Sequence, residues 1–123
     1  SGKLFWLPTN HSFYFNDVYT GWISKSYITL DPNITGLTIG RDRGTDAYNH
    51  NVYVNTLVSI KGDVKIYGKA VEIWNEAGFI TGTEAANSGS ILLKAANHIY
   101  LGSPVTLKSY GKDIILWLRC IKR

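Results

Sequence analysis

The sequence predicts an all-β protein: a parallel β-solenoid (β-helix) of short strands with an aromatic-rich N-terminal segment. The main observation is a series of apolar–x–apolar triplets in the second half of the chain. Each triplet is too short for a helix and alternates with a period of two residues, which is typical of a short strand with one buried face. Glycine, asparagine, aspartate and serine separate the triplets, as tight turns require. The triplets are Val52-Tyr53-Val54, Val58-Ser59-Ile60, Val64-Lys65-Ile66, Val71-Glu72-Ile73, Ile91-Leu92-Leu93, Ile99-Tyr100-Leu101, Val105-Thr106-Leu107 and Ile114-Ile115-Leu116.

Length and composition are those of one globular domain. The chain has 123 residues, of which 45% are hydrophobic and 18% charged, so it can bury a modest core and is not of disordered composition. We therefore expect a single domain over residues 1–123. The sequence contains no methionine, and we expect Ser1-Gly2 to be a processed or cut end of a fragment from a longer protein.

Residues 1–33 form the first section of this domain and are rich in aromatic side chains. We expect a strand at Tyr27–Leu30 and a longer excursion at His11–Trp22 that covers part of the strand stack. Trp22, Tyr19 and Tyr14 are the candidate ligand-binding residues, because flat aromatic faces stack on sugars while tryptophan and tyrosine add a polar atom. The alternative is that these aromatic side chains close the end of the stack, which would otherwise expose unpaired strand edges.

Residues 34–117 are expected to form stacked coils. The central residues of four triplets, Tyr53, Glu72, Leu92 and Ile115, follow one another at intervals of 19, 20 and 23 residues. These intervals predict a turn of about 20 residues, with two or three short strands that stack in parallel from one coil to the next. An up-and-down antiparallel barrel remains the alternative, because a period of two residues does not report the direction of pairing.

Three further features complete this section of stacked coils. Leu37-Thr38-Ile39 predicts another strand, and the small polar residues at 85–90 predict a loop. Glycines are expected at the corners, where a backbone without Cβ can turn sharply. These glycines are Gly62, Gly68, Gly78, Gly82, Gly102 and Gly111.

Residues 118–123 are expected to be a tail. They contain the one basic cluster, whereas the other basic residues are scattered and the formal net charge is only +4, so no nucleic-acid partner is expected. Cys120 is the only cysteine, which excludes an intrachain disulfide and a thiolate metal site. No apolar run approaches the roughly 18 residues of a membrane-spanning helix, so the chain is not expected to span a membrane.

The order of several short motifs resembles a known family. Gly36-Leu37-Thr38-Ile39-Gly40 is followed by the runs 62–68, 89–95 and 112–117. This succession resembles the long repeats of giant filamentous-haemagglutinin-like surface adhesins of gliding and aquatic bacteria, and residues 3–15 resemble the segment that precedes the first motif there. The resemblance covers most of the chain and implies a secreted parallel β-solenoid with a role in adhesion. After Trp117 the chain departs from the pattern, because Leu118-Arg119-Cys120-Ile121 stands where the family has polar, aspartate-rich residues.

No catalytic or metal-binding motif is recognisable. The three histidines lack zinc-ligand spacing and are expected on the surface: they are His11, His50 and His98. Asp42 and Asp46 could help to bind calcium, but the arginines beside Asp42 already neutralise these carboxylates. We therefore expect neither a metal nor a cofactor.

A polysaccharide-cleaving enzyme would need two facing carboxylates. Glu72 is the clearest carboxylate within a predicted strand, and we expect it to form a surface charge pair with Lys65 or Lys94. Trp74 and Trp117 are expected on a flat face of the stack or in its core.

These observations favour a non-catalytic structural and adhesive module of a secreted bacterial surface adhesin. Its expected partners are neighbouring repeats of the same chain and cell-surface or extracellular glycans. The alternative is a carbohydrate-binding module that uses the N-terminal aromatic residues, and a polysaccharide-active enzyme is the third hypothesis.

Overall fold

The computed structural model describes residues 2–6, 13–14, 31–41 and 51–118. Within these ranges the protein is all-β, apart from one short 3-10 helix, η1 (Ala85–Asn87). The strands are β1 (Gly2–Trp6), β2 (Phe13–Tyr14), β3 (Ile34–Ile39), β4 (Val52–Val54), β5 (Leu57–Ile60), β6 (Gly62–Ile73), β7 (Gly78–Thr81), β8 (Ser88–Leu101), β9 (Thr106–Ser109) and β10 (Ile114–Leu118). The expected strand at 27–30, the excursion at 11–22 and the residues from 119 onwards lie outside the described residues.

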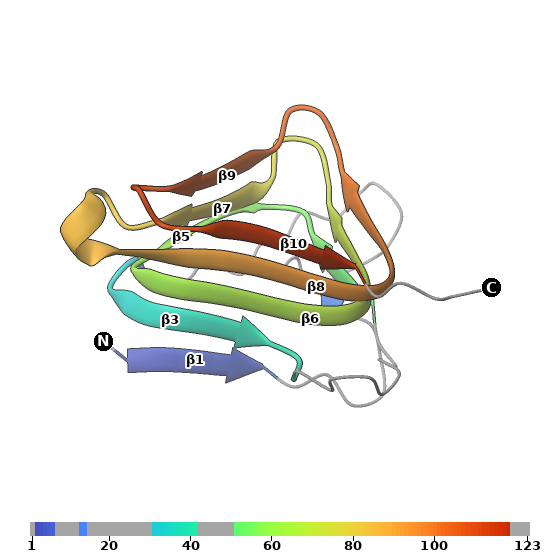
Figure 1. Cartoon of the computed structure of the whole chain (residues 1–123), viewed down its shortest axis with the longest axis horizontal. Coiled ribbons are helices and arrows are strands. Elements are labelled where there is room, and N and C mark those ends of the chain that lie inside the picture. The colour runs from blue at the N-terminus through green and yellow to red at the C-terminus, as the bar shows by residue number, and fades with distance from the viewer. Residues whose placement is uncertain (1, 7–12, 15–30, 42–50, 119–123) are drawn as a thin grey trace.

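All pairings between the described strands are parallel, which confirms the expected parallel all-β fold and makes the antiparallel alternative wrong. Figure 1 shows the two sheets that result. In the larger, seven-stranded sheet, β1, β3, β6, β8 and β10 follow one another, and β4 and β2 extend from the second half of β6. The smaller sheet has the order β5-β7-β9.

Strands β6 and β8 are longer than the triplets predict, because each contains two triplets. β6 pairs with β3 through its first half and with β4 through its second half. Its register on β8 shifts between Gly68 and Ala70. Gly68 therefore lies inside a strand and not at a corner, as glycine at a β-bulge commonly does. β7, which forms the middle of the smaller sheet, was not predicted, because Gly78-Phe79-Ile80-Thr81 is not an apolar–x–apolar triplet.

The register confirms two of the three predicted intervals. Tyr53 pairs with Glu72, and Leu92 pairs with Ile115. Glu72, however, pairs with Tyr100 and not with Leu92, so the predicted 20-residue step between them is wrong. The reason is that the second triplet of β6 stacks on the second triplet of β8, which lies further along the chain.

The inward side chains form continuous columns in the core. Leu37, Val64 and Ile91 are successive register partners and are fully buried. Ile66 and Leu93 are also partners and are equally buried, as predicted. The core further contains Ile39, Val52, Val54, Val58, Ile60, Val71, Ile73, Ala77, Phe79 and Ala95. Side chains of successive strands thus pack directly on one another, and the non-polar area they bury is the main source of stability.

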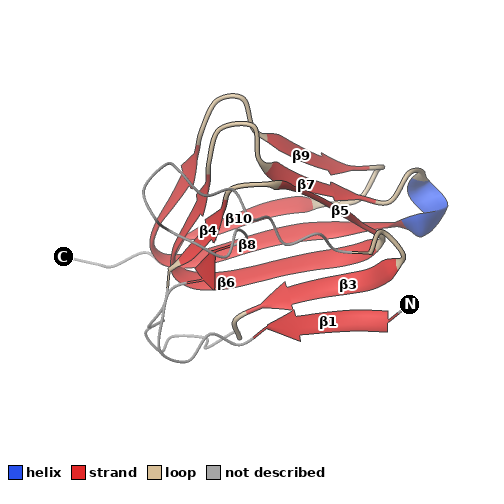
Figure 2. Cartoon of the chain, turned by 180° about the vertical axis from the view of Figure 1, so that it is seen from behind, coloured by secondary structure: helices blue, strands red, loops and turns tan. Residues whose placement is uncertain are grey.

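Sharp corners separate the strands. Gly62 has a φ of +79°, and a Cβ atom at this position would overlap the carbonyl oxygen of Thr35 in the preceding layer. Glycine is therefore required there both for its backbone conformation and for the close approach of the two chains. The predicted loop at 85–90 is η1 followed by the start of β8, and Figure 2 shows η1 at the corner that leads from β7 to β8.

Candidate functional site

One of the predicted ligand-binding residues lies in a row of register partners that crosses the larger sheet. Tyr19 and Trp22 lie outside the described residues. Tyr14 lies in β2, and its register partner is Tyr53 in β4. The ladder continues from Tyr53 to Glu72 in β6 and then to Tyr100 in β8. One of the three predicted residues therefore belongs to a row of positions that the sequence did not assign to a site.

Strand alternation places Tyr53 and Glu72 on the outer face. Val52 and Val54, on either side of Tyr53, are fully buried, and both neighbours of Glu72 in β6 are fully buried as well. Because successive side chains of a strand point to opposite faces, Tyr53 and Glu72 point away from the core. The same columns that build the core thus fix the outward direction of this row.

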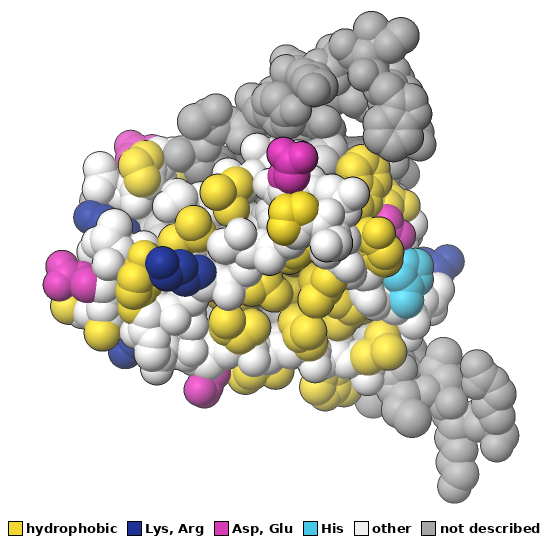
Figure 3. Space-filling view, turned by 90° about the horizontal axis from the view of Figure 1, so that it is seen from above, with side chains coloured by type: hydrophobic (Ala, Val, Ile, Leu, Met, Phe, Trp, Pro, Cys, Tyr) yellow, Lys and Arg dark blue, Asp and Glu magenta, His cyan; other side chains and the backbone are white. Residues whose placement is uncertain are grey.

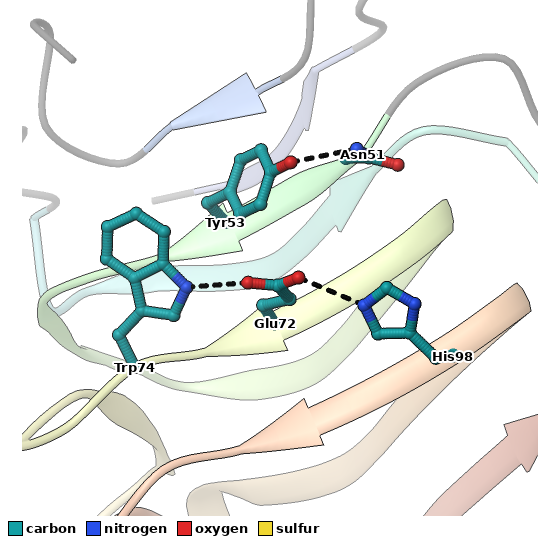
Figure 4. A network of polar contacts seen from close by, with 5 residues as sticks. All are labelled: Asn51, Tyr53, Glu72, Trp74 and His98. Carbon is teal, nitrogen blue, oxygen red and sulfur yellow. Dashed lines mark hydrogen bonds and ion pairs between the residues drawn. The ribbon is translucent and has the colours of Figure 1, made fainter.

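Glu72 and four other side chains form a connected polar and aromatic cluster, shown in Figure 4. Trp74 donates its indole Nε1–H to Glu72 Oε1 at 2.9 Å, and His98 Nε2 lies 3.0 Å from Glu72 Oε2. The rings of Tyr53 and Trp74 contact each other with centroids 5.5 Å apart and a tilt of 50°. Asn51 donates its Nδ2–H to the Tyr53 hydroxyl at 2.8 Å. We call Asn51, Tyr53, Glu72, Trp74 and His98 the Glu72 cluster.

Several elements position this cluster. Tyr53 comes from β4, Glu72 from the end of β6 and His98 from β8, whereas Trp74 follows β6 directly. The Trp74 backbone N–H donates to the Val54 carbonyl oxygen at 2.9 Å, which holds the chain beside β4 after β6 ends. The hydrogen bonds between these parallel strands therefore fix the backbone that carries the cluster.

The carboxylate of Glu72 retains capacity to accept further hydrogen bonds. The Glu72 side chain is 25% exposed and that of His98 is 54% exposed, so ligands from solvent can reach the cluster. A carboxylate offers about four acceptor positions, of which Trp74 and His98 use two. A partly exposed carboxylate beside two aromatic rings can accept hydrogen bonds from hydroxyl groups while a ring faces the apolar side of a sugar.

The predicted pairing of Glu72 with a lysine is wrong. Its partners are Trp74 and His98. Lys65 is seven positions away on the same strand, a separation of about 23 Å at roughly 3.3 Å per residue. Lys94 instead places its Nζ 4.4 Å from the ring centroid of Trp117. That cation–π contact belongs to a different part of the outer face, where Trp117 is exposed.

The other predicted sites contribute no metal centre to the described part of the chain. His98 is on the surface, as expected, and within the described ranges no group of three or more His, Cys, Asp or Glu side chains could hold a metal ion. His11, His50, Asp42, Asp46 and Cys120 lie outside the described residues.

No helix within the described ranges is long and apolar enough to cross a membrane.

The comparisons with known proteins identify no relative of this chain. Searches with protein-family models, curated proteins and solved structures found no match to this chain.

Proposed function

We propose that the domain is a non-catalytic structural and adhesive module, one repeat of a secreted bacterial surface adhesin of the filamentous-haemagglutinin-like class. The observation that carries the proposal is the unbroken parallel succession β1, β3, β6, β8 and β10 in one sheet. This succession supports a parallel β-solenoid, in which each coil contacts only its neighbours. Steps such as Leu37 to Val64 to Ile91 support coils of 27 residues in the middle of the stack, longer than the expected 20 or so.

The proposed mechanism is geometric. A stack of paired strands is stiff, so it holds outward side chains at fixed positions relative to one another. Contacts of this kind are individually weak, but many repeats acting together raise the effective concentration of each contact and hence the avidity. Adhesion then needs no deep cavity and no chemical step.

The Glu72 cluster is the part of the described outer face that we assign to such a contact. Trp74 and Tyr53 provide aromatic rings in mutual contact, and the Glu72 carboxylate is held in place by hydrogen bonds to Trp74 and His98. We assign to it a glycan ligand, whose pyranose ring lies against an aromatic face and whose hydroxyl groups donate to the carboxylate.

Adhesion under flow tests this proposal. Beads coated with the wild-type domain are expected to stay on a glycan-bearing cell surface, and beads coated with the Trp74→Ala variant are expected to detach. Trp117→Ala is the matched control, because it removes an exposed tryptophan that contacts Lys94 and not Glu72. Equal retention of all three bead types would refute the role of the cluster, and no retention of wild-type beads would refute the adhesive function.

A discrete carbohydrate-binding module is the second candidate, favoured by the compactness of the cluster and by the neighbouring register position of Tyr14. The two candidates differ in valency. A binding module is expected to saturate with soluble glycan as a single domain, whereas an adhesive repeat is expected to bind strongly only when many copies act together. A titration of the monovalent domain with soluble glycan therefore separates them.

The proposal assigns no glycoside hydrolysis to the domain. That reaction uses two carboxyl groups about 5 to 9.5 Å apart, and the groups that contact the Glu72 carboxylate directly are an indole and an imidazole. Incubation with polysaccharides is expected to release no reducing ends. Release that disappears in Glu72→Gln would overturn the non-catalytic assignment.

A further inference from the structure

One end of the stack leaves its core side chains uncovered. β10 pairs with β8 on one side, and it has no partner on its other side among the described strands. Ile114, Leu116 and Leu118 continue the columns of Ile91, Leu93 and Ala95, but every residue of β10 is exposed, with Leu116 at 47%. Figure 3 views the molecule from the side of β9 and β10, and hydrophobic side chains gather across the middle of that face.

The opposite edge of the same sheet is also unpaired within the described part of the chain. β1 pairs only with β3 among the described strands. Leu4 is only partly buried against the core, and Phe5 on the outer face is 68% exposed. β1 and β10 are the same length, five residues each, and run in the same direction.

The two edges are complementary in register. Leu4 belongs to the column of Leu37, Val64, Ile91 and Ile114, so continuing that column places Leu4 of an incoming strand on Ile114. In this register Phe5 falls beside Ile115, and both side chains are exposed and apolar. Lys3 falls beside Asp113, and both are exposed and of opposite charge. The inward side chains, the outward apolar side chains and the opposite charges are thus all matched in the same register, the one that places Leu4 on Ile114.

We propose that β10 is a docking edge for a second copy of this chain, which seats its β1 in parallel with Leu4 on Ile114. The contact is head to tail, since each copy uses a different edge. A contact of this type that does not close into a ring generates a filament with a continuous sheet. The backbone N–H and C=O groups that have no strand partner within the described ranges, on both edges, pair in this contact, because an exposed strand edge is a template for pairing with another chain.

The inference rests on the stacked fold and not on the Glu72 cluster. Its failure would leave glycan contact untouched, and loss of glycan contact would leave the docking edge untouched. The two proposals therefore stand or fall in separate experiments.

Sedimentation velocity over a range of protein concentrations tests the docking. The wild-type chain is expected to form species that grow beyond a dimer as concentration rises. Leu116→Glu is expected to weaken association by roughly tenfold or more, because it buries a charge at the contact. Ile80→Glu is the control for an added charge, since Ile80 lies on the outer face of β7, between β5 and β9. This control is expected to associate like the wild type.

A charge exchange tests the register without disturbing the fold. Lys3→Asp and Asp113→Lys are each expected to weaken association by about two- to fivefold, as is typical of exposed ion pairs. The double variant is expected to restore it, because each contact again joins opposite charges. Circular dichroism at low protein concentration verifies that each variant is folded. If Leu116→Glu does not fold, the charge exchange between Lys3 and Asp113 tests the docking instead. A wild type that stays monomeric at all concentrations would overturn the proposal, as would a double variant weaker than both single variants.

Discussion

The stack predicts that one substitution will have very different effects at two positions in the same column. Leu93 and Leu116 are register partners on β8 and β10, but Leu93 is fully buried and Leu116 is 47% exposed. Leu93→Ala is expected to lower the free energy of unfolding by about 2–5 kcal/mol, because it removes buried methyl groups and leaves a cavity. Leu116→Ala removes the same atoms from a half-exposed site without closing a cavity. At about 0.8 kcal/mol per buried carbon, its expected loss is only about 1 kcal/mol.

Urea unfolding at low protein concentration measures both values from the midpoint and the slope m. Both variants are expected to keep the wild-type m value, which verifies that they unfold from the same folded state. A Leu116→Ala loss as large as that of Leu93→Ala would mean that Leu116 is covered, so that β10 is not the open end of the stack. A Leu93→Ala loss below about 1 kcal/mol would refute the inward direction of the column itself.

Three further substitutions test the core and the corners, each followed by thermal or urea unfolding. Ile66→Asp is expected to prevent folding, because a carboxylate would replace a fully buried side chain; a variant that melts like the wild type would show that the register is wrong. Gly62→Ala is expected to cost more than about 1 kcal/mol, since the φ of +79° and the Thr35 carbonyl both disfavour a Cβ atom. An unchanged melting temperature would contradict that geometry. Thr81→Val is expected to cost about 1–3 kcal/mol, because the buried Thr81 hydroxyl donates to the Gly89 carbonyl oxygen at 2.7 Å; a neutral effect would show that this hydrogen bond contributes little.

The strands and their inward faces could be predicted from the sequence, because the alternation of apolar and other side chains is visible within a few consecutive residues. Val52-Tyr53-Val54 corresponds to β4, and its two valines are buried as the pattern requires. The pattern fails at β10, where Ile114 and Leu116 have inward register positions but remain exposed. Burial there depends on whether another layer follows, and the period of a single strand carries no information about that.

The register was harder to predict because it depends on how long each strand continues. Spacing between triplets gave the correct partner for Tyr53 but not for Glu72. Two triplets merge into one strand when the residues between them keep an extended backbone, as they do around Gly68. A glycine then marks a β-bulge in some places and a corner in others, and composition does not distinguish the two.

The candidate site could not be predicted without the register between the second halves of β6 and β8. Tyr53 and Glu72 could be aligned from their spacing, but His98 meets Glu72 only because the second halves of β6 and β8 stack. Trp74 lies beyond the end of its strand, so no strand period predicts its direction. Aligning the triplet centres Tyr53, Glu72 and Tyr100 would have shown this outward row of polar and aromatic residues. That alignment requires the step from Glu72 to Tyr100 in place of the predicted step from Glu72 to Leu92.

Glycan binding by a multivalent form of the domain is the decisive test of the proposed adhesive role. The measurement is a glycan array probed with wild-type, Trp74→Ala and Trp117→Ala domains, each coupled to the same multivalent carrier and each verified to be folded. If the Glu72 cluster holds the glycan, the wild type and Trp117→Ala bind the same glycans and Trp74→Ala loses them. Wild-type binding that Trp74→Ala leaves unchanged, or no binding to any glycan, would contradict it.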